Sequence, residues 1–115
     1  MTITIEQAQE KDADFIRDCN CAMAMETEGK NLSLAVVERG VKRLIQNPAY
    51  GFYLIAKDGE KAVATLMVTT EWSDWRDGAF WWIQSVYVQP EYRRQGIYRQ
   101  MYQFVKDKAA SDPDV

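Results

Sequence analysis

The sequence contains no histidine, and this absence removes several common kinds of active site. Neither Ser-His-Asp nor Cys-His catalysis is available, so any acid or base must be Asp, Glu, Tyr, Cys or Lys. Cysteine is scarce as well: Cys19 and Cys21 are the only two, and two thiols cannot complete a zinc tetrahedron. We therefore expect no metal site. A spacing of two residues turns these side chains to different sides of a helix, so we expect no disulfide between them.

An excess of positive charge and a long apolar run are also missing. The net charge is −3 at pH 7 and the pI is about 4.9, which is unlike the basic face that nucleic acids require. A cationic small molecule or peptide is the better electrostatic partner. No apolar run approaches the roughly 18 residues of a membrane-spanning helix. We expect one cytoplasmic domain with a single core, with no membrane or nucleic-acid partner.

The remaining pattern predicts the order strand, helix, helix, three antiparallel strands, helix. Ile3 and Ile5 alternate with polar residues as in a strand, and helical spacing of apolar residues follows in two segments, 15–23 and 36–45. Asp-Gly pairs at 58–59 and 77–78 predict turns between strands. The fold class is therefore α+β, with a mostly antiparallel sheet flanked by helices.

The stretch from Gln84 to Arg99 reads as a strand, a turn and a helix. β-branched and aromatic residues precede Pro90, which ends the strand because it has no N–H. The apolar residues after the turn are spaced as on one helix face: Ile97, Met101, Phe104 and Val105. The first amides of a helix lack internal partners, Gly96 allows close approach to the backbone, and Arg93 and Arg94 add positive charge. This chemistry suits a phosphate or pyrophosphate.

Order and motif together resemble the GNAT superfamily of acetyl-CoA-dependent N-acetyltransferases. The family signature at its phosphate turn is Arg/Gln-x-x-Gly-x-Gly/Ala, and Arg93 to Tyr98 matches it except that Tyr98 replaces a small residue. The preceding Gln84–Pro90 segment resembles the family's fourth strand with its Val-x-Pro exit. The resemblance covers nearly the whole chain and implies a three-layer α/β arrangement.

The resemblance implies acetyl-CoA as the co-substrate. Backbone amides from Arg94 to Arg99 would hold the pyrophosphate, and Val86 and Val88 would pair with the pantetheine arm like an added strand. An amide near Val86 or Tyr87 would polarise the thioester carbonyl. The residues expected at the cofactor are thus Val86, Tyr87, Val88, Arg93, Arg94, Gln95, Gly96, Ile97, Tyr98 and Arg99.

Acetyl transfer to an amine also needs a base, because ammonium groups have pKa values near 10. We expect Glu71 or Asp74 to be this base and prefer Glu71, since Trp72 and Trp75 are placed to desolvate it and raise its pKa. Tyr87 is a candidate acid. The side chains expected at the acceptor amine are Glu26, Glu28, Trp72 and Trp75, the tryptophans acting by cation–π contact. A plain role as solvated surface charges also fits the four acids, Glu26, Glu28, Glu71 and Asp74.

The family's sheet normally continues for about three more strands and a helix. We therefore expect residues 1–115 to form a GNAT-like domain truncated at its C-terminus, with the strand Ala79–Val88 as an open edge that self-associates, for instance as a homodimer. Two functions stay open. One is an N-acetyltransferase that acts on a primary amine of a small molecule or peptide. The other is a catalytically incomplete fragment that binds coenzyme A or assembles with itself.

Overall fold

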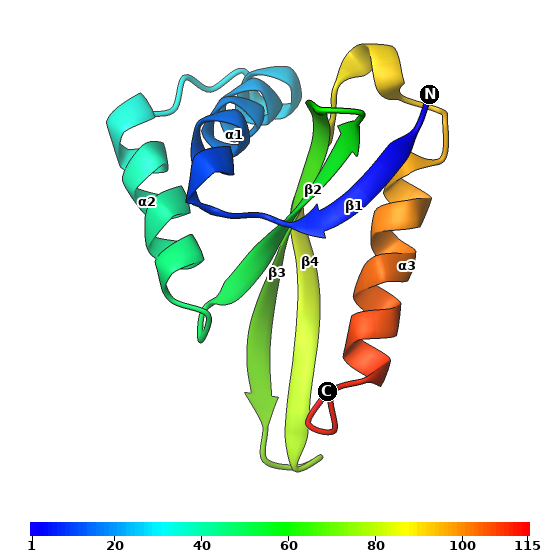
Figure 1. Cartoon of the computed structure of the whole chain (residues 1–115). Helices are drawn as coiled ribbons and strands as arrows, with labels where there is room; N and C mark the ends of the chain where they lie inside the picture. The colour runs from blue at the N-terminus through cyan, green and yellow to red at the C-terminus, as the bar shows by residue number, and fades with distance from the viewer.

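The computed structural model describes residues 1–115 and has the predicted order of elements (Figure 1). The strands are β1 Ile3–Gln7, β2 Gly51–Asp58, β3 Lys61–Ser73 and β4 Gly78–Val88, and the helices are α1 Ala13–Glu28, α2 Leu34–Gln46 and α3 Ile97–Ala110. Short 3-10 helices lie at Glu10–Asp12 and Pro90–Tyr92. The strands form one antiparallel sheet in the order β1-β2-β3-β4, which confirms the α+β class.

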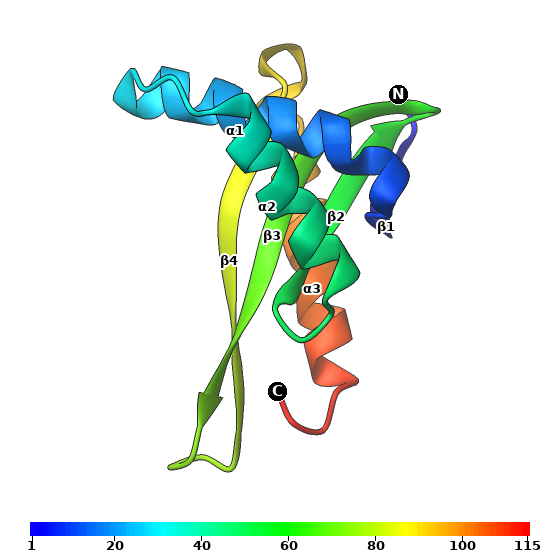
Figure 2. The same cartoon turned by 90° about the vertical axis from the view of Figure 1, so that its left-hand side faces the viewer.

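Helices cover both faces of the sheet, α1 and α2 on one side and α3 on the other (Figures 1 and 2). Neighbouring strand residues point to opposite faces, so Leu54 enters the core under α3 with Met101, whereas Ile55 enters the core under α1 and α2 with Ile16. All four of these side chains are fully buried. This alternation explains why β2 is a nearly continuous apolar run.

The β3–β4 hairpin is longer than the sequence pattern indicates. The run of apolar and β-branched residues ends at Thr70, but β3 continues to Ser73 because residues 71–73 pair with residues 78–80. We call the outer part of this hairpin, residues 69–82, the arm. Figures 1 and 2 show the arm reaching beyond the ends of α2 and α3. No helix is long and apolar enough to cross a membrane.

Gly51 is the glycine on which the sheet depends most. Its φ is +146°, and a Cβ placed there would lie 1.9 Å from the Val68 carbonyl oxygen of β3. We expect Gly51→Ala to lower the free energy of unfolding by more than about 2 kcal/mol. The matched control is Gly40→Ala in α2, where a Cβ meets nothing within 4 Å, and this change should raise stability by about 0.5–1 kcal/mol. Urea denaturation checks both, and equal midpoints for the two variants would contradict the fold.

The two cysteines differ in environment, as their spacing predicted, and both are free. Burial raises the pKa of the Cys19 thiol to about 12, while Cys21 is only half-buried. We expect a thiol reagent at mildly alkaline pH to label Cys21 in the folded chain and leave Cys19 unmodified. Mass spectrometry of the labelled protein checks this, with Cys21→Ser as the control that should abolish labelling. Labelling of Cys19 before unfolding would contradict its burial.

Candidate functional site

A β-bulge interrupts β4 near its end and determines which way the following side chains point. Met67 of β3 pairs with Gln84 and Thr65 pairs with Tyr87, so Ser85 and Val86 together oppose a single β3 residue. Ser85 has φ +51°, in the left-handed region. Bulges of this kind bend a strand and re-aim its side chains. After this bulge Val86 packs with the core under α3, whereas Tyr87 lies toward α1 beside Glu26.

β4 is an edge strand of this sheet, with β3 as its neighbour on one side. The Gln89 amide donates to the Val63 carbonyl of β3 at 2.9 Å, so the N–H and C=O of Val88, one residue earlier, face the free edge. The Val88 carbonyl is already used, because Arg93 Nε donates to it at 2.8 Å. Its N–H remains free for an extended ligand that lies along the edge.

The turn between β4 and α3 has the backbone geometry of an anion site. Arg94 and Gly96 both have positive φ, +64° and +78°, and α3 begins at Ile97 with no side-chain cap on its first amides. A Cβ on Gly96 would meet nothing within 4 Å, so the space beside the turn is open. Uncapped amides at the positive end of a 14-residue helix attract anions. We call residues 93–99 the phosphate turn.

The side chain of Arg93 points away from the start of the helix. One of its terminal nitrogens lies 3.3 Å from each Glu26 carboxylate oxygen, and its guanidinium carbon lies 5.2 Å from the centre of the Tyr87 ring. Arg93 therefore joins the end of α1 to the end of β4. Sequence reasoning placed Arg93 at the cofactor and missed this link, because the partners are 67 residues apart and no local pattern signals it.

Glu26, Tyr87 and Arg93 line a hollow of about 360 Å³ with Met23, Thr27, Val86 and Val88. Tyr87 is only 8% exposed. Burial and the nearby Glu26 carboxylate raise the pKa of Tyr87, and Tyr87 together with Arg93 lowers the pKa of Glu26. At neutral pH the pair is thus a phenol beside a carboxylate. Glu28 does not join this group; it is exposed and lies 3.9 Å from Lys30.

The arm holds the other predicted side chains, in an arrangement that differs from the prediction. Glu71 pairs across the strands with Phe80, on the α1/α2 face, and Trp82 Nε1 donates to its carboxylate at 2.8 Å. Trp72 pairs with Ala79 and so points to the α3 face, and it is 60% exposed, while Trp75 at the tip is 95% exposed. Neither tryptophan covers Glu71, so the expectation that Trp72 and Trp75 desolvate Glu71 is wrong. Asp74 lies in the exposed turn at the tip.

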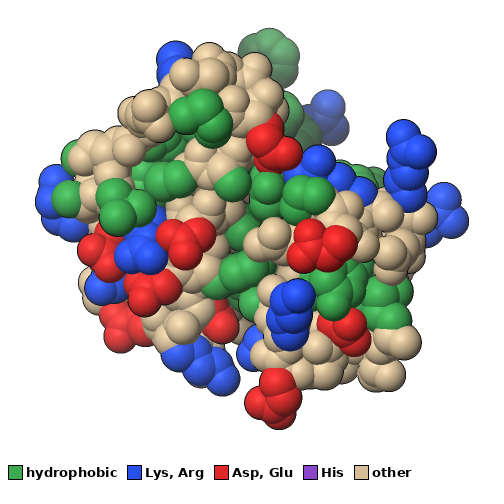
Figure 3. Space-filling model, turned by 90° about the horizontal axis from the view of Figure 1, so that it is seen from above, with side chains coloured by type: hydrophobic (Ala, Val, Ile, Leu, Met, Phe, Trp, Pro, Cys, Tyr) green, Lys and Arg blue, Asp and Glu red, His purple; other side chains and the backbone are tan.

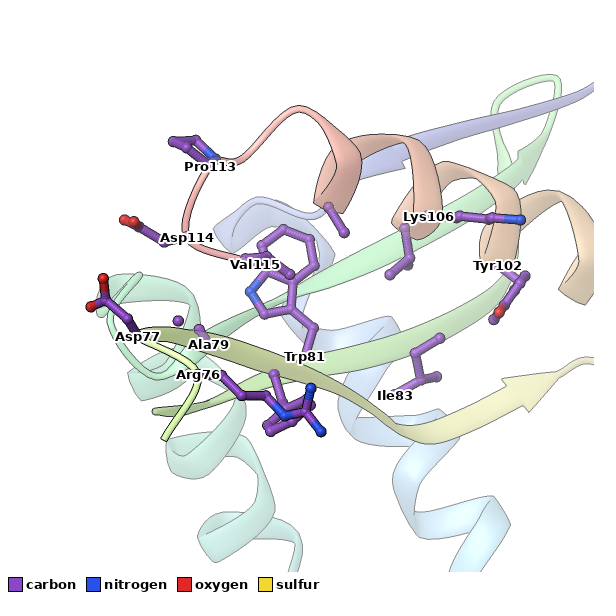
Figure 4. Close-up of a pocket in the computed structure, with 14 residues that line it drawn as sticks. Arg76, Asp77, Ala79, Trp81, Ile83, Tyr102, Lys106, Pro113, Asp114 and Val115 are labelled. Atoms are coloured by element: carbon purple, nitrogen blue, oxygen red, sulfur yellow. The ribbon is translucent and has the colours of Figure 1, made fainter. Parts of the chain in front are cut away.

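A second hollow lies on the other face, between β4 and α3. It has a volume of about 490 Å³, and Figure 4 shows Trp81 and Ile83 of β4 near Tyr102 and Lys106 of α3, with the segment from Pro113 to Val115 at one end. It lacks the uncapped amides of the phosphate turn. Figure 3 shows the molecule from above. At this end acidic and basic side chains are interspersed, and no single sign of charge dominates.

Comparison with known proteins gives a consistent result. The sequence profile of the acetyltransferase (GNAT) family matches residues 9–114. A possible acetyltransferase from Clostridium difficile 630 is 43% identical, with a TM-score of 0.93 over 100% of this chain and 76% of that one. No curated protein matches significantly.

More distant solved structures share the fold. A predicted acetyltransferase from Clostridium acetobutylicum, solved with acetyl-CoA, is 17% identical with a TM-score of 0.77, covering 95% of this chain and 74% of its own. A ribosomal-protein-alanine N-acetyltransferase from Brucella melitensis biovar Abortus 2308 is 16% identical with a TM-score of 0.76, covering 95% and 72%.

Proposed function

The chain belongs to the acetyltransferase (GNAT) family and is an acyltransferase, and we propose that it transfers an acetyl group from acetyl-CoA to a primary amine of a small molecule or peptide. One observation carries this proposal: the uncapped start of α3 follows two left-handed residues and adjoins a bulged edge strand. An anion site and an open strand edge side by side suit a ligand with a pyrophosphate and an extended amide-containing arm. Coenzyme A has both parts, and the Clostridium acetobutylicum neighbour was solved with acetyl-CoA.

We assign the cofactor's parts along this surface. The pyrophosphate lies on the amides of residues 94–99, where Gly96 leaves room for it. The pantetheine arm runs along the free edge at Val86 and Val88, and the Val88 N–H is available to it. The amide of Val86, at the bulge, donates to the thioester oxygen and stabilises the negative charge that develops there during attack.

Tyr87 and Glu26 are the groups nearest to the proposed thioester position that can take a proton from the acceptor amine. Glu71 pairs with Phe80, six residues before Val86, so Glu71 and the more distant Asp74 lie on the order of 15 Å along the strand from the thioester. A general base works within hydrogen-bond reach or through one water. We therefore assign proton removal to the relay at the bulge and not to Glu71 or Asp74.

In this relay the ammonium proton passes to the Tyr87 oxygen as the Tyr87 proton passes to the Glu26 carboxylate. The neutral amine attacks the thioester carbon, the C–S bond breaks, and coenzyme A leaves as a thiolate that takes a proton from water. The second amine proton is lost to water, and Glu26, with its side chain 42% exposed, returns its proton to solvent. Arg93 is a positioning residue here, since it holds Glu26 beside Tyr87.

Calorimetric titration with acetyl-CoA tests the proposal. We expect saturable binding to the 115-residue chain, and Arg94→Ala should weaken it about tenfold because a charge beside the pyrophosphate is lost. Arg39→Ala, an exposed arginine in α2, is the matched control and should bind as the unmodified chain does. Absence of binding at millimolar acetyl-CoA would contradict the proposal. Binding without acetylation of any amine would favour the alternative, a coenzyme A-binding module.

We also propose that β4 associates with a second copy of the chain through the free edge of residues 78–84, before the bulge, so that Val86 and Val88 stay open to the pantetheine arm. All eleven residues from Gly78 to Val88 are uncharged, and edge strands are normally protected by charge. Sedimentation should show a concentration-dependent dimer, and Gln84→Lys, which adds a charge to the edge, should shift the chain toward monomer. A monomer at every concentration tested would contradict this proposal.

A further inference from the structure

The arm carries an aromatic and acidic patch on its α1/α2 face that the proposed chemistry does not use. Trp82 and Phe80 are 52% and 40% exposed, and Trp82 Nε1 fixes the Glu71 carboxylate at 2.8 Å. Thr69 and Gln84 border them and are hydrogen-bonded to each other at 3.1 Å. We call Thr69, Glu71, Phe80, Trp82 and Gln84 the arm patch. Large apolar side chains are seldom left open together without a partner.

The segment beside the arm patch has an excess of negative charge. Residues 71–78 contain three acids, Glu71, Asp74 and Asp77, and one base, Arg76, so this segment carries a net charge of −2. The Trp82 indole donates to only one Glu71 oxygen, and the other Glu71 oxygen is left for a further donor. A carboxylate held beside exposed aromatic rings is an arrangement that attracts cations by charge and by cation–π contact.

The chain's own arginine shows that this surface accepts a guanidinium. The guanidinium carbon of Arg76 lies 5.3 Å from the centre of the Phe80 ring, within cation–π range. Phe80 is thus partly occupied from within the molecule, whereas no cation of the chain lies over the Trp82 ring. The open position for an external cation is therefore at Trp82, beside Glu71.

We propose that the arm patch binds a basic peptide segment, with one lysine or arginine side chain over Trp82 and its charge on Glu71. This inference rests on the proposed function, because the peptide is taken to bring the acceptor amine to Tyr87 while a second cationic residue is held on the arm. Trp82 and Tyr87 pair with Thr69 and Thr65, which are four residues apart on β3, so about 13 Å separates the two positions along the sheet, a length that about four extended peptide residues span. A small monoamine is too short to use both ends.

Charge favours such a peptide over a second copy of this chain on the same patch. Two arm patches brought face to face would juxtapose two segments of net charge −2, and each chain carries −3 overall. Like charges at an interface are unfavourable, whereas a segment rich in lysine and arginine complements them. Association of two copies through the β4 edge leaves this face of the arm open.

Tryptophan fluorescence gives a direct readout, because all four tryptophans, Trp72, Trp75, Trp81 and Trp82, lie in the arm. The probe is a short synthetic peptide of lysine, arginine, glycine and serine. It is compared with a version that has lysine as its only basic residue and carries an acetyl group on every amine, and with spermidine. We expect saturable binding of the basic peptide that weakens about tenfold with Glu71→Gln and about threefold with Trp82→Phe, which keeps a ring but loses the indole N–H. Glu60→Gln, in the β2–β3 turn, and Trp75→Phe, at the tip, are the matched controls and should bind as the unmodified chain does.

Several results would overturn the inference. Equal weakening by Glu71→Gln and Glu60→Gln would mean that only net charge matters, and equal binding of spermidine would mean that no peptide is needed. Sedimentation showing that Glu71→Gln breaks a dimer would assign the patch to a second copy. Acetyl-CoA titration of the same variants separates the two proposals. Peptide binding without acetyl-CoA binding would contradict the acetyl-transfer proposal but support peptide binding at the arm patch. Acetyl-CoA binding without peptide binding would contradict only the proposal for the arm patch.

Discussion

Gly96→Glu is expected to weaken acetyl-CoA binding at least about a hundredfold. The added carboxylate would stand beside the amides that hold the pyrophosphate, so it would repel the ligand and compete with it for those donors. The left-handed backbone of Gly96, at φ +78°, adds strain of about 1 kcal/mol that the fold tolerates, because the new side chain meets open space. Calorimetry with acetyl-CoA measures the loss, and circular dichroism checks the fold.

The chain offers a close control for this substitution. Gly59, in the turn between β2 and β3, also has a left-handed backbone, at φ +61°, and open space around its Cβ position. Gly59→Glu therefore carries the same strain and the same charge but lies away from the phosphate turn. It should bind acetyl-CoA like the unmodified chain. If Gly59→Glu and Gly96→Glu reduced affinity equally, the loss would reflect charge or stability, and the assignment of the phosphate turn would be wrong.

Tyr87→Phe is expected to lower kcat about 10²–10⁴-fold with acetyl-CoA affinity unchanged, since the relay between the amine and Glu26 is broken. Glu26→Gln should have a similar effect on kcat. Both effects are measured as thiol release from acetyl-CoA in the presence of a lysine peptide. Because the pKa of Glu26 is lowered and that of Tyr87 is raised, both groups stay in their active forms across about pH 6–9. The rate should then rise with pH only as the acceptor ammonium loses its proton.

Two further variants make this prediction specific. Tyr102→Phe, on the exposed side of α3, removes a hydroxyl away from the relay and should leave kcat unchanged. Glu71→Gln should raise the KM for the peptide and leave kcat within about threefold, because Glu71 is assigned to docking and not to proton transfer. A large fall in kcat with Glu71→Gln, together with normal turnover by Tyr87→Phe, would restore Glu71 as the base and refute the relay.

Local patterns predicted the backbone of residues 93–99 well. The glycine after two arginines, the proline that ends the strand and the apolar spacing from Ile97 are contained within one short stretch, and the structure places a left-handed residue at Gly96 and a helix start at Ile97. The order and pairing of the strands followed in the same way from two Asp-Gly turns and from runs of β-branched residues.

Side-chain neighbours in the arm could not be predicted, because they depend on strand register. The sequence suggested that Trp72 and Trp75 accompany Glu71, since they are close in the chain. The register instead pairs Glu71 with Phe80 and turns Trp72 to the opposite face. A strand's side chains alternate, so a neighbour in sequence is rarely a neighbour on the same face.

The contacts of Tyr87 and Arg93 escaped prediction for a similar reason. The bulge at Ser85 aims Tyr87 toward α1, yet serine seldom adopts a left-handed backbone and gives no local signal of a bulge. The contact of Arg93 with Glu26 joins residues 67 positions apart, at the ends of different elements. Such a pair becomes visible only when the helix and the sheet are packed together.

The most direct test of the central claim is an NMR titration of the isotopically labelled chain with acetyl-CoA, in which backbone amide shifts are followed residue by residue. The account predicts saturable shifts concentrated at Val86–Val88 and at residues 94–99, with the arm tip around Trp75 unchanged. Shifts confined to the hollow between Trp81 and Tyr102, or no shifts at millimolar acetyl-CoA, would contradict it.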